Sequence, residues 1–166
     1  MDRISNFRDL FAYDWWSNVR VADALIAAPA SPENAAELLA HIVGAARLWF
    51  GRLQGDAAGL QPWPTLSLAE SRAAFDELRS AWRAYLDTLT PERLLDEVSY
   101  TNSMGVAYSS TIGDILTQVI NHSTYHRGQI ASAMRRAGLA PVLTDFIVYA
   151  RESDGRGGMK EEVDGR

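Results

Sequence analysis

Apolar residues recur every three or four positions along most of this chain, which is the period of one buried helix face. In the first such stretch they are Phe7, Leu10, Phe11, Trp15, Val21, Ala22 and Leu25. The same period returns three times, so the pattern predicts four helices, over residues 6–28, 31–53, 67–89 and 111–138. Because these helices are long and their links are modest, we expect an all-α, antiparallel four-helix bundle.

Local residue choices agree with these boundaries. Ser31 before Pro32 is typical of a helix start, because serine caps free backbone N–H groups and proline is tolerated in the first turn. The other signals are a capping box at Ser67 and Glu70, a similar start at Thr111 and Asp114, and glycine stops at Gly55 and Gly138.

Three segments outside the helices lack the helical period. Residues 55–65 are dense in Gly and Pro, which predicts a loop. In residues 97–110, apolar residues alternate around a turn-prone Asn-Ser-Met-Gly centre, which predicts a small β-hairpin or an extended loop between the third and fourth helices. Residues 143–150 predict a short helix or an extended segment laid on the bundle.

The pattern indicates a single domain followed by a tail. Residues 1–150 contain all the periodic stretches, and we find no internal repeat or second domain in them. Residues 151–166 mix charges with four glycines, a composition that predicts a flexible charged, Gly-rich tail.

Charge and composition narrow the choice of partners. The net charge is −5 and the 16 basic residues are scattered, whereas nucleic-acid binding needs clustered Lys and Arg, so we expect no nucleic-acid partner. No uninterrupted apolar stretch has the length of a membrane helix, and the N-terminus lacks the apolar core of a signal peptide. With no Cys, these features lead us to expect a cytoplasmic protein without a membrane partner.

The chain has only three histidines, and their placement is the main chemical signal. His122 and His126 stand four residues apart, so on a helix they project from one face. His41 lies on the apolar stripe of the second helix and is predicted to point into the bundle. Together they could bind one divalent ion, because three protein ligands and an open position are typical of a catalytic zinc-type centre. Without Cys, thiolate ligands are excluded.

A plainer interpretation stays open. Each histidine could be a core residue satisfied by its own hydrogen bond, with no metal bound. Three such residues, two of them one helical turn apart, are harder to explain than one shared ion. The residues between His122 and His126 are Ser, Thr and Tyr, so the Glu that serves as general base in zinc proteases is missing and no catalytic residue can be assigned.

Three stretches of the chain resemble the DinB-like family of metal-binding proteins. The most specific is Tyr125-His126-Arg127-Gly128-Gln129-Ile130, which follows Leu116 to His122 and precedes Arg135 to Pro141 and Thr144-Asp145-Phe146. The segments Phe11 to Asn18 and His41 to Trp49 are similar to the tyrosine–tryptophan–asparagine run of the family's first helix and the histidine segment of its second. The resemblance spans about residues 5–150.

This resemblance implies a four-helix bundle with up-down-down-up connectivity. It also implies a divalent metal, usually nickel or zinc, held by His41, His122 and His126, and a homodimer. Better-studied members act with low-molecular-weight thiols, which makes a small-molecule thiol the expected substrate.

Two functional hypotheses follow. In the first, the protein is a metal-dependent enzyme, a thiol (S-)transferase or a hydrolase, in which the metal lowers the pKa of a thiol or a water molecule. In the second, it is a non-catalytic stress-response bundle with a structural metal and a dimerisation role.

Neighbouring residues complete the predicted site. Asn18, Asp14 and Gln118 are candidates to accept the second N–H of the metal-binding histidines, because such histidines usually donate to an oxygen. We expect Arg127 to form a surface or interface ion pair, and Gly128 to allow close approach of a neighbouring helix. Trp16 or Trp63 is expected to line the pocket mouth or a dimer interface, with loop packing as the alternative.

Overall fold

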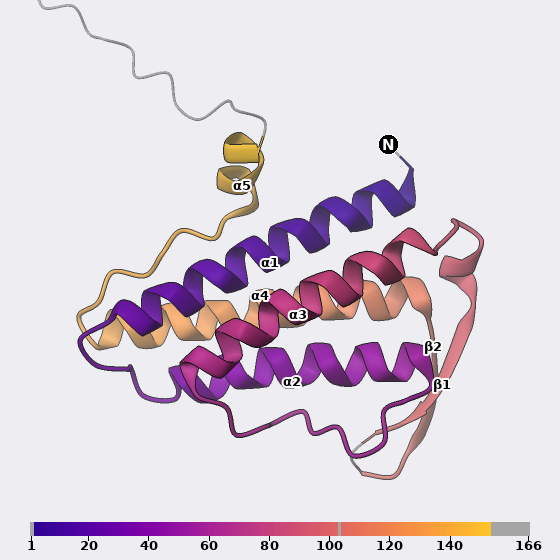
Figure 1. The fold of residues 1–166 in the computed structure, drawn as a ribbon, viewed down its shortest axis with the longest axis horizontal. Helices are drawn as coiled ribbons and strands as arrows, with labels where there is room; N and C mark the ends of the chain where they lie inside the picture. Colours follow the sequence, from indigo (N-terminus) through magenta and orange to yellow (C-terminus); the bar gives the residue numbers. More distant parts are fainter. Residues whose placement is uncertain (1, 103, 154–166) are drawn as a thin grey trace, which may run out of the picture.

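The computed structural model describes residues 2–102 and 104–153. It is mostly helical with a small two-stranded sheet, which confirms the predicted class at that level (Figure 1). The elements are α1 (Arg3–Ala27), α2 (Ala35–Gln54), α3 (Leu68–Asp87), the short 3-10 helix η1 (Arg93–Leu95), β1 (Glu97–Thr101), β2 (Ala107–Thr111), α4 (Ile112–Arg136) and α5 (Phe146–Ser153).

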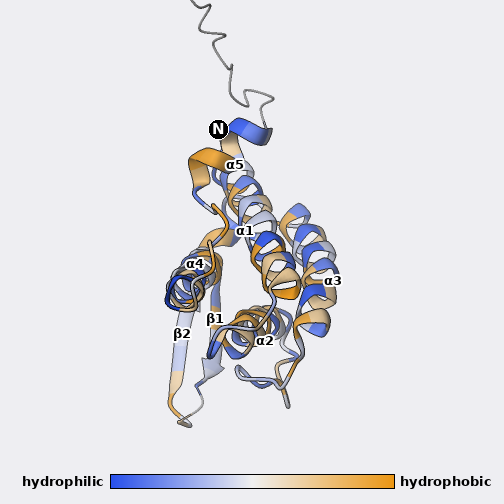
Figure 2. Cartoon of the chain, turned by 90° about the vertical axis from the view of Figure 1, so that its left-hand side faces the viewer, coloured by the Kyte–Doolittle hydropathy of each residue, from blue (hydrophilic) through white to orange (hydrophobic). Residues whose placement is uncertain are grey.

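The four long helices enclose one apolar core, and Figure 2 shows them end-on. Helix α2 packs against α4 and α3, whereas α1 packs against α3 and α4. Trp82 of α3 is fully buried at the centre, in contact with the rings of Phe11 and Phe50. Such large aromatic side chains contribute much of the burial that holds the helices together.

Four helix boundaries follow the predicted chemistry, and one does not. Gly55 ends α2 in a left-handed conformation, φ 73°, as predicted. The Ser67–Glu70 capping box is formed, the Thr111 side chain caps the backbone N–H of Asp114, and Gly138 adopts a left-handed φ of 75° after α4. The second helix starts at Ala35, four residues after the predicted Ser31 cap. Its cap is Asn34 in a left-handed conformation, φ 61°, a geometry that asparagine tolerates better than most residues.

The loop after α2 runs back along the bundle to the start of α3 (Figure 1). Two glycines of α2, seven residues apart on one face, let it lie directly on that helix. A Cβ on Gly44 would stand 2.4 Å from Pro64 Cδ and 2.6 Å from the Pro62 carbonyl oxygen, and one on Gly51 would stand 2.6 Å from the Asp56 carbonyl oxygen. Any side chain at either position would therefore push the loop away.

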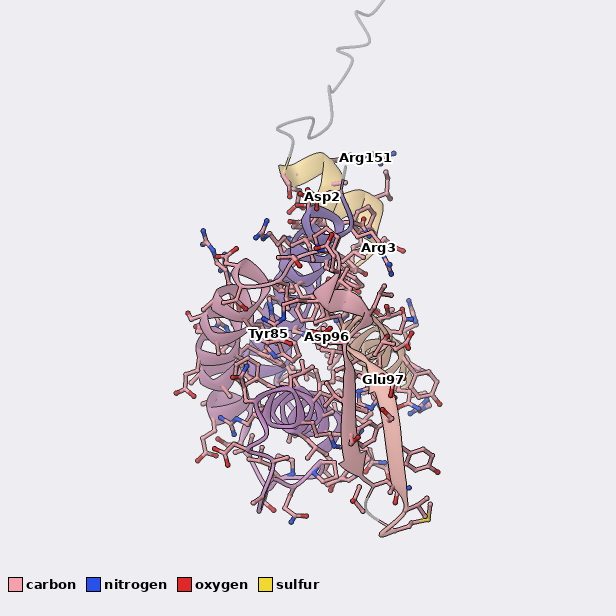
Figure 3. All side chains as sticks on the ribbon, turned by 90° about the vertical axis from the view of Figure 1, so that its right-hand side faces the viewer. Asp2, Arg3, Tyr85, Asp96, Glu97 and Arg151 are labelled. Carbon is pink, nitrogen blue, oxygen red and sulfur yellow. The ribbon has the colours of Figure 1, made fainter. Side chains whose placement is uncertain are left out.

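The predicted hairpin is present between η1 and α4. Strands β1 and β2 pair antiparallel, with Glu97 opposite Thr111 and Tyr100 opposite Tyr108. In Figure 3 the strands run from the labelled Glu97 down one side of the bundle. The side chain of Arg52 on α2 donates to the Thr101 carbonyl oxygen at 3.2 Å, and the Tyr100 ring packs edge-on against Trp49, so β1 is fastened to α2.

The chain after α4 ends in α5, which corresponds to the helical alternative predicted for residues 143–150. Tyr13 of α1 donates to the Thr144 carbonyl oxygen at 2.8 Å and packs against Phe146. Helix α5 extends to Ser153, three residues into the predicted tail, and residues 154–166 lie outside the described part of the chain. None of the described helices is both long and apolar enough to span a membrane.

Candidate metal centre

The packing of α2 against α4 brings all three histidines to one point. The Nε2 atom of His122 lies 3.1 Å from Nε2 of His41 and 3.1 Å from Nε2 of His126. His41 and His126 are 7% and 8% exposed, while His122 is half-buried. One ligand nitrogen from each residue lies within 4.8 Å of the others, an arrangement that could hold a metal ion.

The outer nitrogens of two rings are held by oxygen acceptors. Nδ1 of His41 lies 2.7 Å from the Pro62 carbonyl oxygen, and Nδ1 of His126 lies 2.8 Å from Oε1 of Gln129. An oxygen that accepts fixes the proton on Nδ1, so Nε2 of each neutral ring carries a lone pair directed at the centre. This is the arrangement that metal-bound histidines use.

Hydrogen bonds among the three histidines cannot satisfy all three Nε2 atoms. If His122 carries its proton on Nε2, it can donate to His41 or to His126, and the lone pair of the other ring is left without a donor. A cation at the centre would accept all three lone pairs at once. The donor set therefore fits a divalent ion of the kind that binds imidazole nitrogen, such as zinc or nickel.

Electrostatics also keep protons out of the cluster. Burial, together with the neighbouring His126 and His41, lowers the pKa of His122 to about 4. Burial lowers the pKa of His41 as well, although the hydrogen bond to Pro62 opposes part of that effect. At neutral pH both rings are uncharged, which is the state in which imidazole binds a metal.

Trp63 covers one side of the centre. Its ring stacks on His41 with centroids 3.6 Å apart and planes 9° apart, and it lies nearly perpendicular to the His126 ring, with centroids 6.5 Å apart. The side chain is still 58% exposed, so it separates the histidines from solvent on that side. Trp63 therefore lies against the candidate site, which agrees with the predicted role at the pocket mouth. Gly44 is what allows the loop carrying Pro62 and Trp63 to reach His41.

A buried ion pair joins α4 to α1 at the residue that follows His126. Arg127 is 3% exposed and Asp14 is 1% exposed, and the two are in direct contact. Asp14 also accepts from the Ser123 hydroxyl, Asn18 accepts from Arg127 at 2.7 Å, and Thr124 accepts from the other guanidinium nitrogen at 2.7 Å. Because Ser123 and Arg127 directly follow His122 and His126 in α4, the network fixes how that helix is turned against α1.

Several predicted neighbours of the histidines play other parts. Asn18 and Asp14 bind Arg127 and make no hydrogen bond to a histidine within the described residues, and Gln118 is exposed. The acceptors are Pro62 and Gln129. The expectation of a surface or interface pair for Arg127 is wrong, because Asp14 neutralises it in the core.

Gln129 was detectable from the sequence, because it follows His126 by three residues on the same helix. Pro62 was not, because it reaches His41 only through the path of the loop. Gly128 has open space where a Cβ would stand, so no neighbouring helix requires a glycine there.

Comparison with known proteins agrees with this fold. The model of the DinB family matches residues 6–161. Protein DinB of Bacillus subtilis (strain 168) is 25% identical over 158 residues, which cover 84% of this chain and 91% of that protein. The crystal structure of a DinB-like protein from Bacillus cereus ATCC 10987 superposes with a TM-score of 0.64 at 20% identity, over 84% of this chain and 95% of the other. At that identity the structural likeness supports the fold alone.

Substitution of Gly44 by Ala should lower the metal affinity of the candidate centre, although Gly44 is not one of its ligands. The added Cβ must push the Pro62 and Gln61 carbonyl groups away, which removes the acceptor of His41 and displaces Trp63. Loss of such an acceptor typically lowers metal affinity about ten- to a hundred-fold. Competition with a chromophoric chelator measures this. Gly128→Ala is the matched control, since its Cβ meets open space and should leave affinity unchanged; equal affinities in all three proteins would contradict this role of Gly44.

The metal-free protein should lose stability in acid partly through His122. Its pKa is about 4 in the folded state and about 6.5 when unfolded. The unfolded chain therefore binds more protons below pH 6.5, and the free energy of unfolding falls as the pH drops from about 6.5 to about 4. His122→Gln has no imidazole to titrate there, so urea unfolding should show wild type losing stability relative to the variant between pH 7 and pH 4.5. Parallel profiles would refute the assignment.

Breaking the buried ion pair between Asp14 and Arg127 should lower the stability of the fold. Asp14→Ala leaves the Arg127 charge buried without its partner, which we expect to lower the free energy of unfolding by about 3–5 kcal/mol. The double variant Asp14→Ala, Arg127→Met should recover part of this loss, because no unpaired charge remains. Arg72→Ala, which breaks exposed pairs with Asp23 and Asp76, should cost less than about 1 kcal/mol. Urea unfolding compares them, and additive effects of the two core changes would count against a coupled pair.

Proposed function

This chain belongs to the DinB family, and on that premise we propose that it binds a divalent metal ion through His41, His122 and His126 and acts as a metal-dependent thiol (S-)transferase. The observation that carries the proposal is the convergence of three imidazole Nε2 atoms whose outer nitrogens are already held by Pro62 and Gln129. Nickel or zinc is the expected ion, since imidazole ligands suit both. Hydrolysis is the variant of the proposal in which water takes the place of the thiol.

When bound, such an ion lowers the pKa of a coordinated thiol or water and so supplies a nucleophile at neutral pH. The protein's own residues prepare the site for this. Pro62 and Gln129 keep the lone pairs of His41 and His126 directed inward. Trp63 shields the His41 ring from water, and the low pKa of His122 keeps that ring neutral. Three neutral ligands leave the full positive charge of the ion to act on the substrate.

Three wider features belong to the same proposal. We infer up-down-down-up connectivity for the four long helices, which is supported by the return of residues 55–67 along the bundle (Figure 1). We infer a homodimer from the family resemblance, and a cytoplasmic location, which suits a chain without Cys.

A second candidate is a stress-response bundle in which the metal is structural. It is favoured by one observation: the ligands come from both α2 and α4, so an ion would cross-link two helices. The two candidates differ in what metal removal does to stability and in what thiols do to the metal.

The first test is metal content. Protein purified without a His-tag should contain about one divalent ion per chain by elemental analysis, and His122→Ala should lose it. Under the transferase proposal the variant keeps most of its thermal stability, because the core of the bundle does not include the ion. A large fall in melting temperature on loss of the ion would favour the structural candidate, and absence of metal from the wild type would refute both.

The second test is thiol activation. In protein loaded with cobalt, a small thiol should produce the near-ultraviolet band of a cobalt-bound thiolate. The loaded protein should also join that thiol to an electrophile such as chlorodinitrobenzene faster than the metal-free protein does. His122→Ala serves as the control that keeps the fold but not the ion. A rate equal to that of the metal-free protein, with several thiols, would overturn the transferase proposal.

A further inference from the structure

A cavity of about 630 Å³ lies between α2, the loop after α2 and strand β1. Its lining combines apolar side chains, such as Leu48 and Leu60, with polar groups of the loop and of β1. A cavity of this volume accommodates a small molecule. Pro62, whose carbonyl oxygen holds His41, is one of the lining residues, so the cavity adjoins the loop that completes the metal centre.

Arg52 supplies the positive charge of this cavity, and it is the one charged side chain in the lining that the described residues provide. Its guanidinium carbon lies 4.4 Å from the ring centroid of Trp49 and 4.4 Å from that of Tyr100, so two aromatic rings flank the group. One guanidinium nitrogen donates to the Thr101 carbonyl oxygen. Within residues 2–102 and 104–153, no carboxylate forms a salt bridge with Arg52. The buried Arg127, in contrast, is paired with Asp14.

This arrangement is typical of a guanidinium held ready for an anion. Aromatic rings stabilise the cation without using its N–H groups, which stay available in the plane of the group. Burial lowers the pKa of Arg52, the sign of a cation that is partly stripped of water without an acidic partner. A ligand carboxylate could accept two parallel N–H bonds from such a group, the strongest pairing that arginine makes.

The cavity and the metal centre lie along the same face of α2. Leu48 and Arg52 follow His41 by seven and eleven residues, which places both within about 20° of His41 around the helix axis. Arg52 is about 16 Å further along the axis at the backbone, although its long side chain shortens the distance to the head group. A molecule that used both sites would be elongated.

We propose that the Arg52 cavity is the subsite that binds the carboxylate of an elongated small-molecule substrate. The inference rests on the proposed function for the other end of that molecule, which would reach the metal centre. The carboxylate belongs either to the thiol or to the electrophile that the thiol attacks. In both cases the apolar part of the lining packs against the chain that connects the two ends.

The first experiment tests the subsite without the metal. Octanoate and octanol are titrated calorimetrically into the metal-free protein. We expect octanoate to bind at least about tenfold more tightly, since a hydrogen bond to a charged group contributes about 1.5–3 kcal/mol. Arg52→Gln should remove that preference, and Arg52→Lys, which keeps the charge but loses the paired donors, should retain part of it. Arg47→Gln is the control, because it removes the same charge from α2 outside the cavity, where Arg47 pairs with Glu77.

Equal affinities for octanoate and octanol in the wild type would overturn the proposal. So would an octanoate affinity unchanged in both Arg52 variants. If Arg52→Gln does not fold, the octanoate preference of Arg52→Lys is compared with that of Arg47→Gln. A weaker preference in Arg52→Lys alone supports the subsite, and equal preferences overturn it.

The second experiment identifies the source of the carboxylate. Mercaptooctanoate and mercaptooctanol are titrated into cobalt-loaded protein while the thiolate band is followed. Tighter binding of the acid, lost in Arg52→Gln, assigns the carboxylate to the thiol; equal binding of the two, with the octanoate preference intact, assigns it to the electrophile. A missing thiolate band with the octanoate preference intact would refute the thiol transferase and leave the carboxylate subsite supported.

Discussion

Three imidazole lone pairs that point at one another are unfavourable unless a cation lies between them, and the rest of this structure is arranged around that constraint. Nε2 of His122 approaches Nε2 of both His41 and His126 at 3.1 Å, and at most one of these contacts can be a hydrogen bond. Only a rigid frame can hold such a cluster in place. The frame here is the contact between α2 and α4, supported by one loop and one buried ion pair.

The two supports act on opposite sides of the cluster. On the α2 side, Gly44 and Gly51 remove the side chains that would keep the loop off the helix, so the Pro62 carbonyl oxygen and the Trp63 ring reach His41. On the α4 side, Asp14 and Asn18 of α1 accept hydrogen bonds from Arg127 in the core. A buried ion pair is often less stabilising than an apolar pair of the same size, but it tolerates few alternative geometries. At this position it sets the rotation of the helix that carries His122 and His126.

The sequence was informative where a structural rule acts between near neighbours. Helical period located the four long helices, the Ser67–Glu70 box and Gly138 marked ends, and one-turn spacing paired His122 with His126. It failed where a contact depends on the path of a distant segment. Pro62 meets His41 from 21 residues away, and Arg127 meets Asp14 from 113 residues away, so no local pattern could reveal either partner. The start of α2 at Asn34 was missed for a different reason. Asn34 caps the helix in a left-handed conformation without a side-chain hydrogen bond, whereas Ser31 before Pro32 matches the more usual cap.

Burial and pairing distinguish Arg127, which has a structural role, from Arg52, which is available for binding. Arg127 is enclosed, its charge is neutralised by Asp14, and both terminal nitrogens of its guanidinium group donate to neighbouring side chains. Arg52 is half-buried, its faces are covered by Trp49 and Tyr100, and the acceptor that the described residues give it is a neutral carbonyl oxygen. A guanidinium in this second state has its position fixed by the protein while its charge is left for another molecule. Because Arg52 lies on the same face of α2 as His41, the proposed function gives it the role of recognising one end of a substrate whose other end reaches the proposed metal ion.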